Sequence, residues 1–236
     1  KDMAPLKENG ELERIRTTPG SYLGSCRYKL PEDLSDPVYP ELFQKFTEKE
    51  ISYFFYIGGN DSMDTVSKLS RYAATVGSDI RIIGVPKTID NDLVLTDHTP
   101  GYGSAAKYVA STVREIAIDA SVYDNKPSVT IVEIMGRNAG WLVGAAALSK
   151  GEDCDGPDLI YVPELPFDID NFLVRIKELL TEKSFVVVAV SEGIRLADGR
   201  YVCELTDGVD FVDAFGHKQL TGTANYLARR LAQEIG

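Results

Sequence analysis

Two carboxylates and a lysine lie within one short stretch of this chain, residues 86–92 (PKTIDND), directly after an apolar run at 80–85 that is typical of a buried strand. In an extended loop Asp90 and Asp92 could face one side, one taking a proton from an attacking hydroxyl group while the other holds Mg²⁺ directly or through water. Lys87 could neutralise charge on the transferring group. The stretch favours phosphoryl transfer over the alternative, a surface loop of solvated charges with an Asx turn.

A glycine-rich turn, Gly58-Gly59-Asn60-Asp61-Ser62, separates a predicted strand from a predicted helix. Its glycines could let a ligand approach the backbone, and the first helical turn offers unpaired N–H groups and the positive end of the helix dipole to a phosphate. Taken alone, the pattern favours an ordinary turn between strand and helix. The charged stretch 86–92 tips the interpretation toward a phosphate site.

Two other predicted strands end in groups that could bind a substrate. Met135-Gly136-Arg137 places a single arginine at a strand end, where its guanidinium could hold a phosphate or sugar oxygen through two hydrogen bonds. A salt bridge explains Arg137 equally well. Glu192, at the end of another strand, could accept hydrogen bonds from sugar hydroxyls, and a helix cap is its alternative role.

Predicted strands and helices alternate along the chain. The expected strands are 51–57, 80–85, 128–135, 159–162 and 185–190, and the expected helices are 60–76, 102–123, 139–150, 168–182 and 218–235. This alternation predicts right-handed β-α-β units, an α/β fold and mainly parallel sheets. A segment rich in Thr, Pro and Gly at 93–103 is the expected boundary between two lobes.

Composition limits the classes of function. With 236 residues and 44% hydrophobic content, the chain can build one large α/β domain or two lobes. Its net charge of −11 disfavours broad binding to nucleic acid or to an anionic membrane, and no apolar run approaches the roughly 20 residues that cross a bilayer. Three cysteines, far apart and without a nearby histidine, predict reduced thiols in a cytoplasmic protein.

The order and approximate spacing of these motifs resemble the phosphofructokinase family, in the Gly-Gly-x-Asp-Ser turn, PKTIDND, MGRNAGW and SEG. The resemblance covers nearly the whole chain. It implies two Rossmann-like lobes, a phosphoryl-donor-binding lobe at 1–100 and a sugar-phosphate-binding lobe at 101–236. It also implies transfer of a phosphoryl group to O1 of fructose 6-phosphate with Mg²⁺, by a homo-oligomer such as a dimer or tetramer.

The same resemblance implies roles for individual residues. Asp90 is expected to deprotonate the sugar 1-hydroxyl, with Thr88 and Lys87 beside it. Asp92 matches the carboxylate associated with the metal site, and Asn60, which stands where many relatives have Asp, could reach the ion through water. The residues expected to contact the substrates are Gly59, Asn60 and Asp61, Met135, Gly136 and Arg137 at the sugar phosphate, Glu192 at the fructose hydroxyls, and Arg27 of the LGSCR segment at the phosphoryl donor.

Asp61 and Lys87 bear on the donor, because ATP-dependent members commonly have glycines at both positions and this pair resembles the pyrophosphate-dependent branch. The Asp61 carboxylate would oppose the α-phosphate of a nucleotide, whereas Lys87 would grip compact pyrophosphate. We therefore expect pyrophosphate as the donor in a reversible glycolytic reaction that yields fructose 1,6-bisphosphate and orthophosphate. An ATP-dependent enzyme is the near alternative, and a non-catalytic regulatory subunit is a more distant one.

The chain starts at Lys1 rather than at a methionine. The family's opening strand and its later sugar-phosphate ligands are expected outside this sequence. We therefore expect the chain to be a segment of a longer protein.

Overall fold

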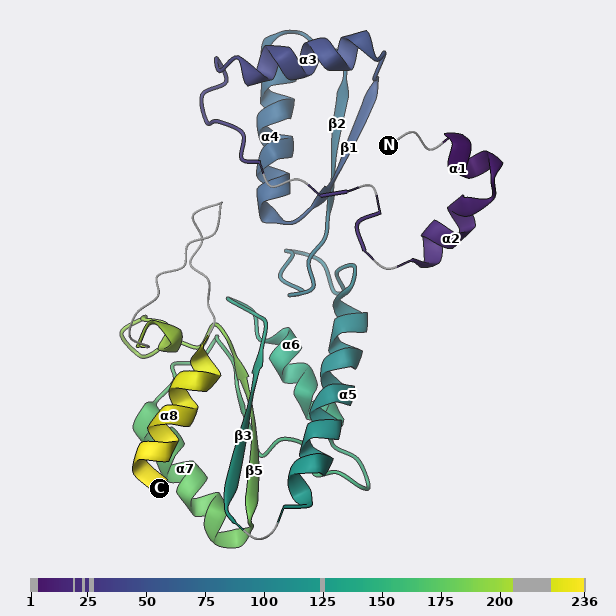
Figure 1. Ribbon diagram of the computed structural model, residues 1–236. Helices are drawn as coiled ribbons and strands as arrows, with labels where there is room; N and C mark the ends of the chain where they lie inside the picture. Colours follow the sequence, from purple (N-terminus) through teal and green to yellow (C-terminus); the bar gives the residue numbers. More distant parts are fainter. Residues whose placement is uncertain are drawn as a thin grey trace.

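The computed structural model describes residues 4–18, 20–22, 24–25, 28–123, 126–205 and 222–235. They form two α/β bodies joined by one loop, with two short helices beside the first body (Figure 1). The first body contains α3 (Val38–Glu48), β1 (Tyr53–Gly58), α4 (Asn60–Thr75) and β2 (Arg81–Pro86). The second contains α5 (Tyr102–Ser121), β3 (Ser128–Ile134), α6 (Trp141–Gly144), η1 (Ala145–Ser149), β4 (Leu159–Tyr161), α7 (Ile169–Glu182), β5 (Phe185–Ser191), η2 (Val202–Leu205) and α8 (Thr223–Ile235).

The sheet of the first body is a parallel pair, β1 beside β2, whose register runs from Tyr53 opposite Arg81 to Gly58 opposite Pro86. The backbone N–H of Lys87 then donates to the Gly58 carbonyl, over 2.9 Å. Because the two strands end level with each other, the glycine-rich turn and the charged stretch leave the sheet at the same edge.

Helices α3 and α4 cover one face of this pair (Figure 1). Each helix places apolar side chains four residues apart, so that they lie on one stripe that faces the strands. Phe54 of β1 and Ile82 of β2 pack against this stripe. The buried side chains of this core are Leu30, Tyr39, Phe43, Leu69 and Ala73.

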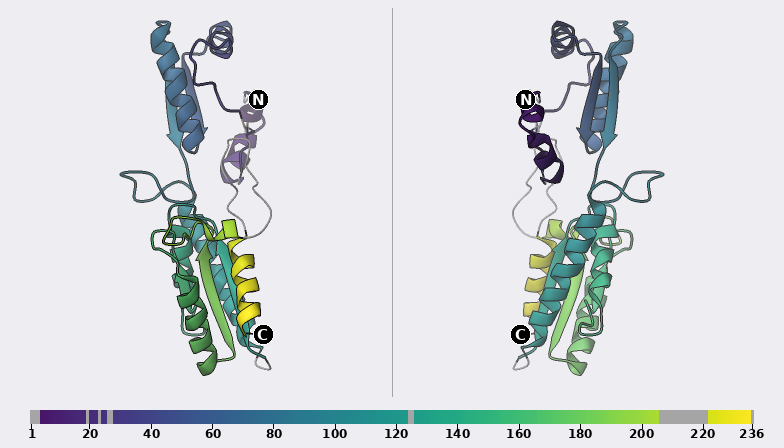
Figure 2. Two further views of the ribbon diagram at one scale, coloured as in Figure 1. Left: turned by 90° about the vertical axis from the view of Figure 1, so that its left-hand side faces the viewer. Right: turned by 90° about the vertical axis from the view of Figure 1, so that its right-hand side faces the viewer.

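The sheet of the second body is parallel throughout, in the order β3-β5-β4. Helices α5 and α6 lie on one face and α7 and α8 on the other (Figures 1 and 2). Residues 186–190 of β5 have no exposed surface, which is why this strand is a continuous apolar run. Each fully buried valine contributes roughly 1.5–3 kcal/mol relative to an exposed one, so β5 is a rigid base for whatever follows it.

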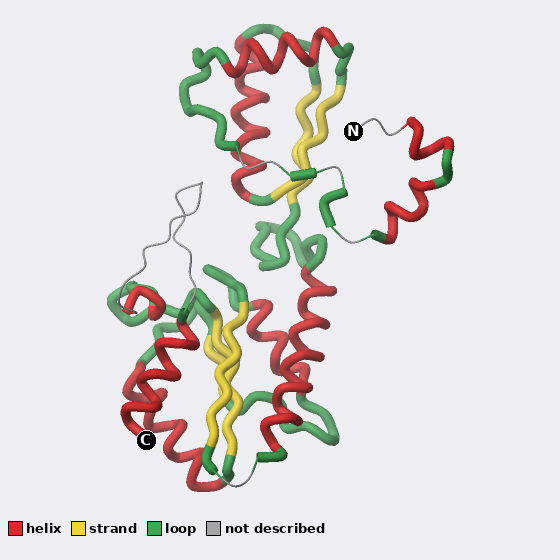
Figure 3. Tube along the Cα trace, in the orientation of Figure 1, coloured by secondary structure: helices red, strands yellow, loops and turns green. Residues whose placement is uncertain are grey.

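The α/β fold with parallel sheets is confirmed, while several boundaries differ from prediction. The single helix expected at 139–150 is α6 followed by the 3₁₀ helix η1. Helix α8, expected over 218–235, begins at Thr223. Residues 218–221 of that expected range lie outside the described residues. Of the segment 93–103, expected as the lobe boundary, residues 93–101 lie in the loop between the bodies, which Figure 3 draws in green, and residues 102–103 begin α5.

Three helices before β1 were not predicted. Helices α1 (Ala4–Glu8) and α2 (Glu11–Thr17) are short and rich in charge, and α2 buries none of its residues. Helix α3 carries Pro40 in its first turn, where a proline is tolerated because the N–H it lacks has no partner within the helix. None of the three shows a long apolar repeat, which is the signal that the sequence offers most clearly.

Candidate active site

The loop after β2 is anchored by Asn91, whose side chain is buried. Its Oδ1 accepts from the backbone N–H of Thr99 (2.9 Å), and its Nδ2 donates to the Asp97 carbonyl (3.1 Å). The Thr99 hydroxyl donates in turn to the Thr88 carbonyl, over 2.7 Å. Asn91 has φ +57°, in the left-handed region that asparagine tolerates better than most residues. The Asn91 contacts close the loop and set the direction of the two carboxylates beside it.

Asp90 is the most unusual group in this loop. Its Oδ1 is buried and has no hydrogen-bond partner among the residues that the structure describes. Burial raises the pKa of the Asp90 carboxyl above its ordinary value, and the negative charge of Asp92 raises it further, while Arg137 and Lys87 lower it. A buried carboxylate oxygen without a partner is costly, and such a group needs an explanation, which a ligand that donates a hydrogen bond or a proton to it would supply.

The second body contributes the turn at 136–138, which is held by the residues after β5. Ile134 lies opposite Ser191, so both strands end at the same edge. The Gly136 N–H donates to Glu192 Oε1 (3.3 Å), and the Ser191 hydroxyl donates to the Gly136 carbonyl (2.6 Å). Gly136 has φ +145°, and a Cβ there would lie 2.5 Å from a backbone oxygen, so the turn requires glycine.

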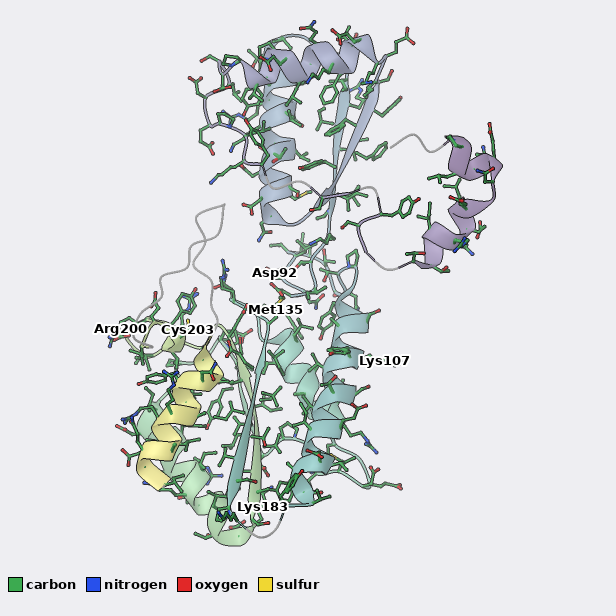
Figure 4. The ribbon with its side chains drawn as sticks, in the orientation of Figure 1. Asp92, Lys107, Met135, Lys183, Arg200 and Cys203 are labelled. Carbon is green, nitrogen blue, oxygen red and sulfur yellow. The ribbon has the colours of Figure 1, made fainter. Side chains whose placement is uncertain are left out.

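Glu192 lies in the same electrostatic environment as Asp90. Burial raises the pKa of the Glu192 carboxyl, and the negative charges of Asp90 and Glu133 also raise it. The hydrogen bond from Gly136 and the positive charge of Arg137 lower it. The structure therefore brings Asp90, Arg137 and Glu192 together at the junction of the two bodies, and Figure 4 shows Asp92 and Met135 at the same junction.

An open pocket of about 450 Å³ lies at the edge where β1 and β2 end. Gly59 and Lys87, both expected at the substrates, are part of its lining, whereas Asn60 and Asp61 are not among the described residues that line it. Asn60 and Asp61 form the first turn of α4, directly after this lining. Arg27 lies outside the described residues. The residues that line the pocket are Ser21, Gly24, Ser25, Tyr56, Ile57, Gly58, Gly59, Ser62 and Lys87.

Comparison with known proteins defines the family. The family model described as phosphofructokinase matches residues 1–236. The chain belongs to the phosphofructokinase family. Two pyrophosphate–fructose 6-phosphate 1-phosphotransferases are similar to it. That of Xanthomonas campestris pv. campestris is 45% identical, over 95% of this chain and 54% of its own length. That of Rhodospirillum rubrum is 46% identical, over 90% of this chain and 51% of its own length.

A solved structure of a pyrophosphate-dependent phosphofructokinase from Marinobacter aquaeolei has the same fold, with a TM-score of 0.78 and 35% identity over all of this chain and 53% of its own. This chain thus spans about half the length of the relatives it matches. Among the described residues, no helix is long and apolar enough to cross a membrane.

The family implies Mg²⁺, and the residues near Asp90 fit it. Within the described parts of the chain, no group of three or more His, Cys, Asp and Glu side chains could enclose a metal ion. Mg²⁺ does not need such a cage, since it is commonly held by one or two carboxylates together with phosphate oxygens and water. Exposed Asp92, whose charge acts on Asp90, is a donor of this kind.

Sequence reasoning missed the residues that position the site. Asn91 and Thr99 close the loop, and Ser191 ties the 136–138 turn to β5. At Gly193 there is no room for a side chain, because a Cβ would lie 2.0 Å from the carbonyl oxygen of Arg137. For Asn91 the sequence offers one signal: asparagine tolerates the left-handed backbone conformation of turns, so an asparagine between two aspartates indicates a turn there. The contacts of Thr99 and Ser191 depend on which segments meet, which a single sequence does not show.

Proposed function

We propose that this chain carries the reaction centre of a pyrophosphate-dependent phosphofructokinase, which transfers a phosphoryl group from pyrophosphate to O1 of fructose 6-phosphate. The products are fructose 1,6-bisphosphate and orthophosphate. The observation that carries the proposal is the buried Oδ1 of Asp90, which has no hydrogen-bond partner in the described part of the chain. The charge of Arg137, from the other body, acts on the same carboxyl group.

Asp90 acts as the general base. It takes the proton of the 1-hydroxyl as O1 forms a bond to phosphorus, and the bridging P–O bond of pyrophosphate breaks to release orthophosphate. Its raised pKa makes it a stronger base than an ordinary aspartate, and the positive charges of Arg137 and Lys87 favour its ionised form. Thr88 lies beside it, with its Oγ1 accepting from the Asp90 backbone N–H over 3.1 Å.

Positive groups balance the charge that the phosphoryl group carries. Lys87 lines the pocket at the edge of the first sheet, so residues 1–100 bind the donor. Arg137 and Glu192, together with Met135 and Gly136, hold the sugar phosphate, so residues 101–236 bind the acceptor. Asp92 would hold Mg²⁺, with Asn60 reaching it through water, and the bound ion would neutralise charge on the phosphates as a Lewis acid.

Two features support pyrophosphate over ATP. Lys87 reaches a pocket that the glycine-rich turn lines, which suits a small, highly charged anion. Asp61 lies in the first turn of α4, next to the glycine-rich turn, where its carboxylate opposes a longer polyphosphate chain. The relatives named above carry pyrophosphate in their names. ATP as donor is the second candidate, and a homo-oligomeric state and a cytoplasmic location stay predictions.

The test is turnover of the full-length protein with pyrophosphate and with ATP at equal Mg²⁺ concentration. Fructose 1,6-bisphosphate is measured as the product with either donor, and orthophosphate release is followed with pyrophosphate. We expect faster turnover with pyrophosphate. A much faster rate with ATP would overturn the donor assignment, and no bisphosphate with either donor would overturn the reaction.

A further inference from the structure

The turn at 136–138 is held at its far end by an arginine that the reaction does not use. Arg195 follows Glu192 by three residues, and its Nη2 donates to Asn138 Oδ1 over 2.6 Å. The same nitrogen donates to the Tyr201 hydroxyl over 2.5 Å, and the guanidinium carbon lies 4.3 Å from the centre of the Tyr201 ring. Arg195 therefore links the residue after Arg137 to a neighbouring loop.

The backbone of Arg195 is itself fixed. Its carbonyl accepts from the N–H of Phe167 over 2.7 Å, and isolated bridges pair Arg195 with Pro166 on one side and with Tyr201 on the other. Phe167 is buried in the core of the second body. The guanidinium thus extends from a rigid point, which is the condition for a side chain to impose an orientation on a turn.

The two ends of the turn are held differently. At its start, Gly136 bonds to Ser191 and Glu192. At its end, Asn138 is exposed, and its side-chain Oδ1 accepts the hydrogen bond from Arg195. Two residues further on, the Gly140 N–H donates to Glu164 Oε1 over 2.7 Å, so without the Arg195 bond the side chain of Asn138 would be released between two fixed points, Gly136 and Gly140.

We propose that Arg195 is a positioning residue for the acceptor site: it holds Asn138, so that Arg137 between the two anchored residues keeps the orientation that binds the sugar phosphate. This inference rests on the proposed function. Lysine cannot replace arginine fully here, because it lacks the planar guanidinium that lies over the Tyr201 ring while one of its nitrogens bonds Asn138.

Arg200 supplies a matched control. It belongs to the same loop and is also an arginine, but it pairs with Asp198 in an exposed ion pair. Figure 4 shows it on the outer side of the second body, apart from Met135. Arg200→Met therefore removes the same charge from the same loop without releasing the 136–138 turn.

The experiment compares Arg195→Met, Arg195→Lys and Arg200→Met in the full-length protein. For Arg195→Met we expect the KM for fructose 6-phosphate to rise by about tenfold, as for the loss of one hydrogen bond to a charged group, with little change in the KM for pyrophosphate. Arg195→Lys should fall between this variant and the unchanged protein. Arg200→Met should leave both KM values unchanged.

Hydrogen exchange of the backbone amides of residues 136–140 gives a readout that does not depend on the reaction. Exchange there should be faster in Arg195→Met and unchanged in Arg200→Met. An unchanged exchange rate in Arg195→Met, or equal rises in both KM values, would overturn the positioning role. A third outcome separates the two proposals. If the wild-type protein forms no fructose 1,6-bisphosphate but exchange is faster in Arg195→Met, the proposed reaction is overturned and the positioning of the turn is supported.

Discussion

Replacing Asp90 with serine should remove activity and stabilise the fold at the same time. The substitution deletes the carboxylate that we assign as the base, and it also deletes an oxygen that is buried without a partner among the described residues. A buried unsatisfied polar group costs about 1–3 kcal/mol, and removing a general base costs about 10²–10⁴-fold in rate. The two effects have opposite signs, which a general loss of structure would not produce.

We therefore expect the kcat of Asp90→Ser to fall by at least about 10²-fold, with the KM for fructose 6-phosphate nearly unchanged, since the base acts on the transition state rather than on binding. The free energy of unfolding should rise by about 1 kcal/mol, the lower end of the penalty, because serine leaves a small void. For 236 residues that corresponds to roughly 2–4 °C in Tm, and to a smaller shift in a longer chain.

Steady-state kinetics and thermal unfolding of the same preparation give both numbers. Asp198→Ser is the control, since Asp198 is an exposed aspartate that pairs with Arg200 in the second body. It should change neither kcat nor Tm appreciably. A kcat of Asp90→Ser within a few-fold of the unchanged protein would refute the assignment of the base, and a lower Tm would refute the cost assigned to the buried oxygen.

Three further results are expected. Asp61→Gly combined with Lys87→Gly should raise the ratio of kcat/KM for ATP to that for pyrophosphate, and no rise would leave both residues without a role in donor choice. Burial raises the pKa of Glu192, so its carboxylate is protonated at a higher pH than that of an ordinary glutamate. As the pH falls through this range the KM for fructose 6-phosphate should rise, and Glu192→Gln should abolish that dependence. Lys68→Met, which removes a buried ammonium bonded to the Leu30 carbonyl, should lower Tm.

The strands and their order of appearance could be predicted because their signal is local. β5 reads as a continuous apolar run because all its central residues are buried, and β2 reads similarly although it is less covered. Helix α3 was missed because its apolar repeat is short and contains Pro40. The break between α6 and η1 was missed because the start of α6 depends on a contact distant in sequence, the bond from Gly140 N–H to Glu164 over 2.7 Å.

That the candidate site residues lie together at strand ends could be predicted for the same reason, since parallel strands bring their ends to one edge, while their roles stay predictions. What could not be predicted is which groups hold them. The contact between Arg195 and Asn138 joins residues 57 positions apart, and that between Ser191 and Gly136 joins residues 55 apart. These distances in sequence exceed what turn or helix patterns report, so only the folded structure reveals them.

The most direct measurement is a crystal structure of the full-length protein with fructose 6-phosphate bound. The 1-hydroxyl should lie about 2.6–3.2 Å from Oδ1 of Asp90, so that the substrate supplies the partner which that oxygen does not find among the described residues. Arg137 and Glu192 should contact the same sugar. A hexose bound with its 1-hydroxyl turned away from Asp90, or bound away from Arg137 and Glu192, would contradict the assignment of the reaction centre.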